Sequence, residues 1–152
     1  MQLDPVDIRL LSALQRDASL TNAELGERVH LSGSQVARRR AGLEAAGVIA
    51  GYRAVLDAQR LGFDFRAVAR VTLNAHGGEN DGDFARFLAG EDRVEAAYSV
   101  SGDADYVLQI VCRGLDDYAA LIHERLLPHP NVAQVRSEIV LRTLKVGGTL
   151  PL

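Results

Sequence analysis

Two helix start signals placed close together constrain the first 50 residues most strongly. Thr21 is followed three positions later by Glu24, and Ser32 is followed three positions later by Gln35. Each pair has the pattern of a capping box, in which the two residues satisfy backbone N–H groups at the start of a helix. The two residues at 30–31 leave room for a tight turn between the helices. Two capped helices joined in this way predict a helix-turn-helix.

A further helix is expected before this pair. Asp4 followed by Pro5 places an N-cap residue before a proline at the first helical position, which is a favourable helix start. Gly47 is expected to end the third helix. We therefore predict a three-helix, winged-helix-like helix-turn-helix domain over residues 1–50. Its apolar faces recur at helical spacing and comprise Val6, Leu10, Ala13 and Leu14, then Leu25 and Val29, then Val36 and Leu43.

The period of the apolar residues changes to two from Phe65 onward, after a connecting strand or linker expected over residues 51–64. The order of expected elements is that of a ferredoxin-like βαββαβ sandwich over residues 65–152, which makes the chain α+β. The expected strands cover residues 65–73, 94–101, 106–113 and 132–145, with a helix after the polar loop from His76 to Gly82 and another over 115–126.

One face of such a sheet is left uncovered by its helices. Val68, Val107, Val111 and Val140 are expected on that face. An exposed apolar face favours association, so we expect at least a dimer, built through residues beyond Phe65.

The charge distribution favours a nucleic-acid partner for the first domain, although the chain carries a net charge of -3. Eight arginines and seven acidic residues lie at or before Arg60, which leaves nine basic and thirteen acidic residues for the remainder. Arg38, Arg39 and Arg40 are consecutive. A local basic stripe attracts phosphate whatever the overall charge. The alternative is that the three arginines form a solvated helix face.

The start of the third helix is the end that enters the major groove in a helix-turn-helix. Arg38 and Arg39 follow it and can reach either phosphates or a guanine edge, a choice that the sequence leaves open. Gln35 is also the capping partner, so its role can be structural. The candidate DNA-binding residues are Ser32, Gly33, Ser34, Gln35, Arg38 and Arg39.

A series of short motifs recurs along the chain in a characteristic order and spacing. They comprise Leu3, Asp4, Asp7, Asp17, Ala18, Glu24, Leu25, Leu31, Ser32, Arg38, Arg39, Leu43, Glu44, Gly47, Val48, Ile49, Ser101–Tyr106, Lys145 and Leu150–Leu152. Through these residues the chain resembles the Lrp/AsnC (leucine-responsive, feast/famine) family of transcription regulators along essentially its whole length. Arg40 and Gly42 depart from the family pattern, which has an aliphatic residue after the first two arginines. The resemblance implies a dimer, often assembled into an octamer, that binds an amino acid or related metabolite between paired C-terminal domains.

The family-like turn at Gly102 and Asp103 is the expected effector site. Asp103 or Asp105 could accept hydrogen bonds from an ammonium group, and backbone N–H groups, hydroxyls and Arg136 could donate to a carboxylate. The competing interpretation is that both aspartates merely shape the turn. The candidate effector-binding residues are Tyr98, Val100, Ser101, Gly102, Asp103, Asp105, Arg136 and Ser137.

An enzymatic function is the alternative, because a ferredoxin-like sheet hosts many chemistries and the chain could be a small metabolic enzyme or its detached regulatory module. The sequence shows no catalytic constellation, and His30, His76, His123 and His129 have no metal-ligand spacing. We therefore expect no enzyme activity, no catalytic residue, no metal and no cofactor.

The cell compartment expected from the sequence is the cytoplasm. Cys112 is the single cysteine and is expected in the core, which fits a reducing environment. No apolar stretch approaches the roughly 18 residues that a membrane span needs, and no secretory signal is visible. Double-stranded DNA and an amino-acid-like effector are the expected partners, with no membrane.

Overall fold

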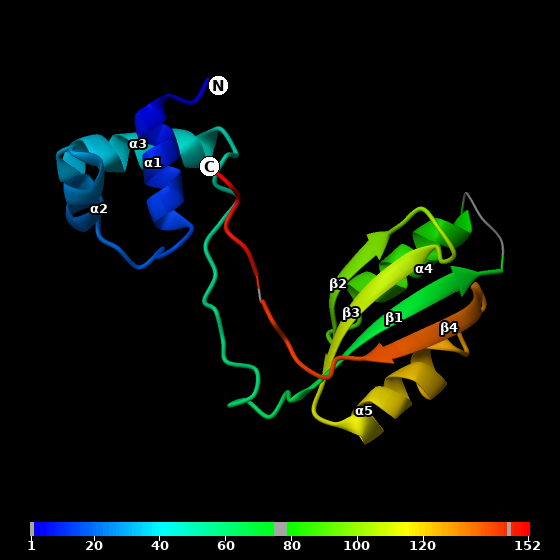
Figure 1. Cartoon of the computed structure of the whole chain (residues 1–152). Coiled ribbons are helices and arrows are strands. Elements are labelled where there is room, and N and C mark those ends of the chain that lie inside the picture. The colour runs from blue at the N-terminus through cyan, green and yellow to red at the C-terminus, as the bar shows by residue number, and fades with distance from the viewer. Residues whose placement is uncertain (1, 75–78, 146) are drawn as a thin grey trace. The chain divides into compact units, whose positions relative to one another are not determined.

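The computed structural model describes residues 2–74, 79–145 and 147–152 (Figure 1). The chain forms two compact units. The first contains Met1–Val55 together with Leu144–Leu152, and the second contains Leu56–Thr143. This division differs from the predicted one at the C-terminal end, because hydrogen bonds between Gln15 and Leu150 join the last residues to the first unit.

The first unit has three helices, α1 (Pro5–Leu14), α2 (Asn22–Val29) and α3 (Gly33–Ala45). Each begins with a complete capping box, formed by Asp4 with Asp7, by Thr21 with Glu24 and by Ser32 with Gln35. The predicted helix-turn-helix is therefore confirmed. Its core consists of Leu10, Leu14, Leu25, Val29, Val36 and Leu43.

The turn between α2 and α3 depends on two residues with special backbone demands. His30 ends α2 in the left-handed conformation, with φ of 60°. A side-chain carbon at Gly26 would collide with the carbonyl oxygen of Leu31. The tight turn therefore requires glycine at position 26 of α2, because only a residue without a Cβ leaves room for the Leu31 carbonyl.

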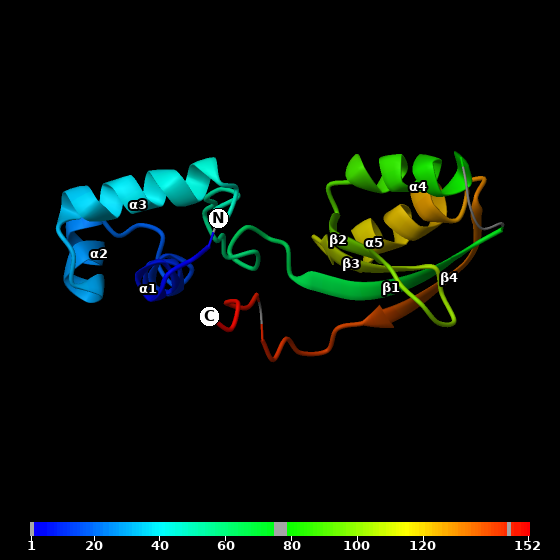
Figure 2. The same ribbon diagram turned by 90° about the horizontal axis from the view of Figure 1, so that it is seen from above.

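The second unit is an antiparallel four-stranded sheet in the order β2-β3-β1-β4. Figure 2 shows α4 and α5 on the same side of this sheet. This is the predicted ferredoxin-like sandwich. The elements are β1 (Phe65–Leu73), α4 (Glu79–Ala89), β2 (Val94–Ser99), β3 (Tyr106–Cys112), α5 (Leu115–Ala120), the π-helix η1 (Leu121–Leu126) and β4 (Val132–Ile139).

Alternate residues of β1 divide the sheet into a core face and an open face. Ala67, Ala69, Val71 and Leu73 are buried in the core. The residues between them, including Arg70 and Thr72, belong to the opposite face, because side chains alternate along a strand. The predicted burial of Cys112 is confirmed.

Several predicted boundaries were wrong. β4 ends at Ile139 and not at Lys145, because its pairing partner β1 begins at Phe65 and the backbone bond from Val140 to Arg66 closes the ladder. The predicted strand character of the connector is not found, since residues 51–57 carry no regular secondary structure. The predicted strand over 94–101 ends at Ser99.

The predicted loop from His76 to Gly82 lies partly outside the described residues, and α4 already begins at Glu79. Among the residues that the structure describes, no helix has the length and apolar character to cross a membrane.

Candidate functional site

The N-terminus of α3 is an exposed, hydrogen-bonded cap. The Gln35 side-chain oxygen accepts hydrogen bonds from the backbone N–H of Ser32 at 2.9 Å and from its hydroxyl at 3.0 Å. The Ser32 and Ser34 hydroxyl oxygens are 3.1 Å apart. The oxygen of Gln35 therefore has a structural role, while its exposed position leaves the NH₂ group able to act as a donor.

The three consecutive arginines of α3 have three different environments. Arg38 is exposed and makes no ion pair or hydrogen bond with the residues that the structure describes. Nη1 of Arg39 lies 2.7 Å from a carboxylate oxygen of Asp4 and 2.7 Å from one of Asp7. The structure thus gives Arg39 a role inside the domain that the sequence did not indicate.

The capping carboxylate of Asp4 is shared between the start of α1 and Arg39. The backbone N–H of Asp7 donates to it and, with the Arg39 guanidinium, lowers the pKa of Asp4 below its usual value. The Asp7 side chain is buried beside it. Both carboxylates help to fix Arg39 between α1 and α3.

Arg40 pairs with Tyr52, the second residue of the connector. Arg40 Nε donates to the Tyr52 hydroxyl at 2.8 Å, and that hydroxyl donates to Glu44 Oε1 at 2.7 Å. The Arg40 guanidinium carbon also lies 4.6 Å from the Tyr52 ring centroid. This cluster explains how an arginine is accommodated at the position where the family pattern has an aliphatic residue.

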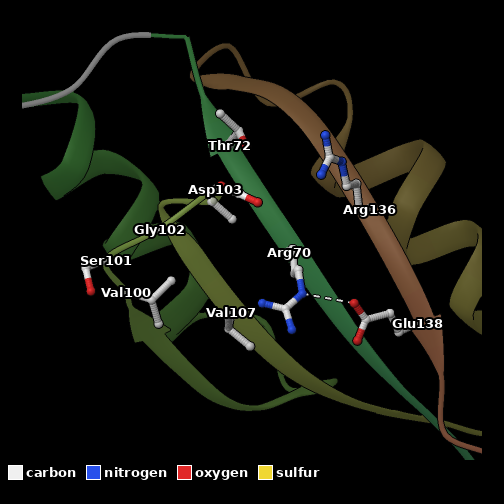
Figure 3. Close-up of a pocket in the computed structure, with 10 residues that line it drawn as sticks. Arg70, Thr72, Val100, Ser101, Gly102, Asp103, Val107, Arg136 and Glu138 are labelled. Carbon is white, nitrogen blue, oxygen red and sulfur yellow. Dashed lines mark hydrogen bonds and ion pairs between the residues drawn. The ribbon is translucent and has the colours of Figure 1, made fainter.

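The second candidate site is a groove of about 580 Å³ in the second unit. Residues of β1, β3, β4 and the β2–β3 turn line it (Figure 3). Its side chains come from the open face of the sheet, opposite α4 and α5. The lining residues are Arg70, Thr72, Val100, Ser101, Gly102, Asp103, Ala104, Val107, Arg136 and Glu138.

The charges around the groove are unequally neutralised. Arg70 Nε lies 2.9 Å from Glu138 Oε1, so these two side chains compensate each other (Figure 3). Arg136 and Asp103 have no ion-pair or hydrogen-bond partner among the described residues. The groove therefore offers one uncompensated cation and one uncompensated anion beside the apolar side chains of Val100 and Val107.

Gly102 gives the groove an open stretch of backbone. Its φ of 139° lies in the range that favours glycine, and a side chain there would meet no atom within 4 Å. The turn that contains it can therefore present backbone groups without steric cover.

Five of the predicted effector-binding residues line this groove: Val100, Ser101, Gly102, Asp103 and Arg136. Three others do not. Tyr98 is half exposed and pairs with Val107 across β2 and β3, outside the lining. Asp105 Oδ2 accepts the backbone N–H of Leu73 at 2.7 Å. Ser137 pairs with the core residue Ala69, so its side chain belongs to the helix-covered face.

The prediction missed five lining residues: Arg70, Thr72, Ala104, Val107 and Glu138. Arg70 and Thr72 occupy polar positions in the alternating pattern of β1. That alternation could have placed them on the open face of the sheet from the sequence alone. Glu138 is opposite Val68 in the register of β1 and β4, a relationship that requires the sheet topology.

The described part of the chain contains no group of three or more His, Cys, Asp or Glu side chains placed to hold a metal ion.

Two family models match the chain. Residues 3–44 match the AsnC-type helix-turn-helix domain, which covers α1 to α3. Residues 66–150 match the Lrp/AsnC ligand binding domain, which covers the sheet and the groove.

Whole-length relatives agree with these matches. The chain is 39% identical to the leucine-responsive regulatory protein of Rhizobium meliloti, over 95% of this chain and 93% of the relative. It is 30% identical to the transcriptional regulator AzlB of Bacillus subtilis, over 100% and 97% of the two chains. A crystal structure of a Neisseria meningitidis transcriptional regulator in complex with L-Met superposes with a TM-score of 0.94 and 33% identity, covering 99% and 97%.

A helix-turn-helix domain joined to a ligand-binding domain defines a DNA-binding transcriptional regulator. The chain belongs to the Lrp/AsnC family of these regulators.

Proposed function

We propose that the groove binds a free α-amino acid and that the bound amino acid changes how the regulator binds DNA or assembles. The observation that carries this proposal is the pair of uncompensated charges, Arg136 and Asp103, at one groove. An α-amino acid presents a carboxylate and an ammonium group, and charge-assisted hydrogen bonds to both are stronger than neutral ones. Val100 and Val107 would face its side chain.

The comparison structures give the first ligand to test. The Neisseria meningitidis regulator was solved with L-methionine. Groove-lining valines favour an apolar side chain of this kind.

The ligand experiment is a thermal-shift screen of the twenty amino acids, because a ligand that binds the native state raises its melting temperature. We expect Arg136→Gln and Asp103→Asn to lose the shift produced by the best amino acid. Arg142→Gln, which removes an exposed arginine outside the groove, is the charge-matched control and should keep it. Equal shifts in all variants would exclude the groove as the site.

For DNA, we propose that the N-terminal end of α3 enters the major groove and that Arg38 contacts the nucleic acid. Ser32, Ser34, Gln35 and Arg38 are exposed, whereas Arg39 is held by two carboxylates. Arg39 then supports the interface by fixing α3 against the start of α1. The proposed target is double-stranded DNA with two half-sites, in the cytoplasm.

We propose that the working form is at least a dimer, with an octamer as the higher assembly. Large apolar side chains are exposed on the segments that join the units: Val55 is 93% exposed and Leu141 is 96% exposed. A second copy of the chain could cover them. Light scattering at micromolar concentration tests this, and a stable monomer would contradict it. The proposed regulator has no enzymatic activity and uses no cofactor.

A further inference from the structure

The segment at residues 147–152 makes a specific contact with the end of α1. Gln15 Nε2 donates to the carbonyl oxygen of Leu150 at 2.9 Å, and the backbone N–H of Leu150 donates to Gln15 Oε1 at 2.8 Å. One primary amide thus satisfies both the donor and the acceptor of one backbone residue. This is the pairing that a neighbouring strand would provide.

The two partners differ in how they are held. Gln15 is the C-cap residue of α1, and its backbone N–H is bonded to Leu11. Its side chain therefore starts from a fixed point. Leu150 is followed by Pro151, which has no N–H, and the N–H of Leu152 donates to the Leu150 carbonyl at 2.9 Å. The segment folds back at the residue that Gln15 captures.

The covalent path gives this contact a mechanical consequence. The chain leaves the first unit between Val55 and Leu56 and returns to it between Thr143 and Leu144. The helix-turn-helix domain is therefore connected to the ligand-binding domain by two chain segments. The second of these segments, at the C-terminal end, is attached to α1 by the hydrogen bonds between Gln15 and Leu150.

We propose that Gln15 is the receptor for a docking segment, residues 147–152 of the same chain, and that this docking is a second tether on the helix-turn-helix domain. A conformational change in the ligand-binding domain can then be transmitted to the helix-turn-helix domain by two routes. One is the connector over residues 51–64, and the other is the docking segment, which contacts the end of α1. The tether role depends on the proposed function, whereas the docking itself does not.

Hydrogen exchange of the full-length protein, followed by mass spectrometry, tests the docking without DNA or effector. The Leu150 amide should be protected in the wild type. It should exchange about tenfold faster in Gln15→Ala, the factor that corresponds to a hydrogen bond of about 1.4 kcal/mol. Gln134→Ala, which truncates an exposed glutamine on β4, should leave the protection unchanged. An unprotected wild type, or equal protection in Gln15→Ala, would overturn the docking.

A mixture of two variants tests whether the docking segment belongs to the same chain. Gln15→Ala keeps the segment and lacks the receptor, whereas a chain shortened after Gly148 keeps the receptor and lacks most of the segment. Co-expressed together, they should show no protection at Leu150. Restored protection would assign the receptor to a second copy and overturn the same-chain assignment.

The tether role is tested with DNA selected from a random library by the wild-type protein. Gln15→Ala should bind a duplex with two half-sites more weakly than the wild type, by up to about tenfold. It should bind a single half-site equally well, because the helix-turn-helix itself is unchanged. If Gln15→Ala and the wild type bind each duplex with equal affinity, although the Leu150 amide has lost its protection in the variant, the tether role is overturned and the docking itself stands.

Discussion

The guanidinium of Arg39 lies 2.7 Å from the carboxylate of Asp7, a side chain only 7% exposed. Arg39 also reaches Asp4, the N-cap of α1. Arg39, the middle residue of three consecutive arginines, thus links α3 to the start of α1 by ion pairs. Its neighbour Arg38 is exposed and unpaired among the described residues.

Arg39→Ala should therefore destabilise the helix-turn-helix domain. The substitution removes the cation from the buried Asp7 carboxylate and leaves it the backbone N–H of Asp4 as a donor, so the free energy of unfolding should fall. Chemical denaturation of the full chain, monitored by circular dichroism, measures this loss. Arg38→Ala is the matched control and should unfold like the wild type. Identical stability of both variants would mean that the ion pair contributes nothing.

Arg38→Ala should instead weaken DNA binding while the fold stays intact. If Arg38 binds a phosphate, the slope of log affinity against log salt should fall by about one in this variant. Fluorescence anisotropy with a labelled duplex at several salt concentrations gives both quantities. Arg9→Ala removes the same charge from an exposed position of α1. An equal loss of affinity in Arg9→Ala would show that general charge, and not the arginine on α3, determines the binding.

Two glycines of the first unit should respond oppositely to alanine. Gly26→Ala places a methyl group against the Leu31 carbonyl oxygen and should cost about 1–3 kcal/mol, the range for overpacking. Gly42, in α3, has no atom within 4 Å of an added Cβ, so Gly42→Ala should stabilise the helix by about 1 kcal/mol. Thermal unfolding of both variants distinguishes these effects. A harmless Gly26→Ala would contradict the close approach at the turn.

The second unit contains a pH-dependent ion-pair cluster. The pKa of Glu91 is lowered, chiefly because Arg93 Nε donates to its carboxylate at 2.7 Å. A lowered folded-state pKa stabilises the protein above the ordinary value of 4.5, and this contribution is lost as the pH falls through the folded pKa. Glu91→Gln should thus be less stable than the wild type at pH 7, and the difference should shrink below pH 4.5. A difference independent of pH would contradict this account.

Local signals in the sequence predicted most of the fold. Two capping boxes, each formed by residues three positions apart, predicted the starts of α2 and α3, and Asp4 followed by Pro5 predicted the start of α1. The alternation in β1 similarly separated the core residues from Arg70 and Thr72. By contrast, the end of β4 depends on where its partner strand begins, which the β4 sequence does not contain.

The candidate sites were less predictable because long-range partners determine them. Arg38 and Arg39 look equivalent in the sequence, and the difference arises from Asp4, 35 residues away from Arg39. Asp103 and Asp105 look equivalent too, yet Asp105 bonds to the backbone of Leu73 and Asp103 borders the groove.

DNA affinity measured with and without the best-binding amino acid tests the central claim most directly. The measurement uses wild type and Asp103→Asn at one salt concentration. We expect the amino acid to change the affinity of the wild type by about 5–150-fold, the usual range for coupled sites. Asp103→Asn should bind DNA like the ligand-free wild type and show no change with the amino acid. An undiminished response in Asp103→Asn, or no response of the wild type to any of the twenty amino acids, would contradict the account.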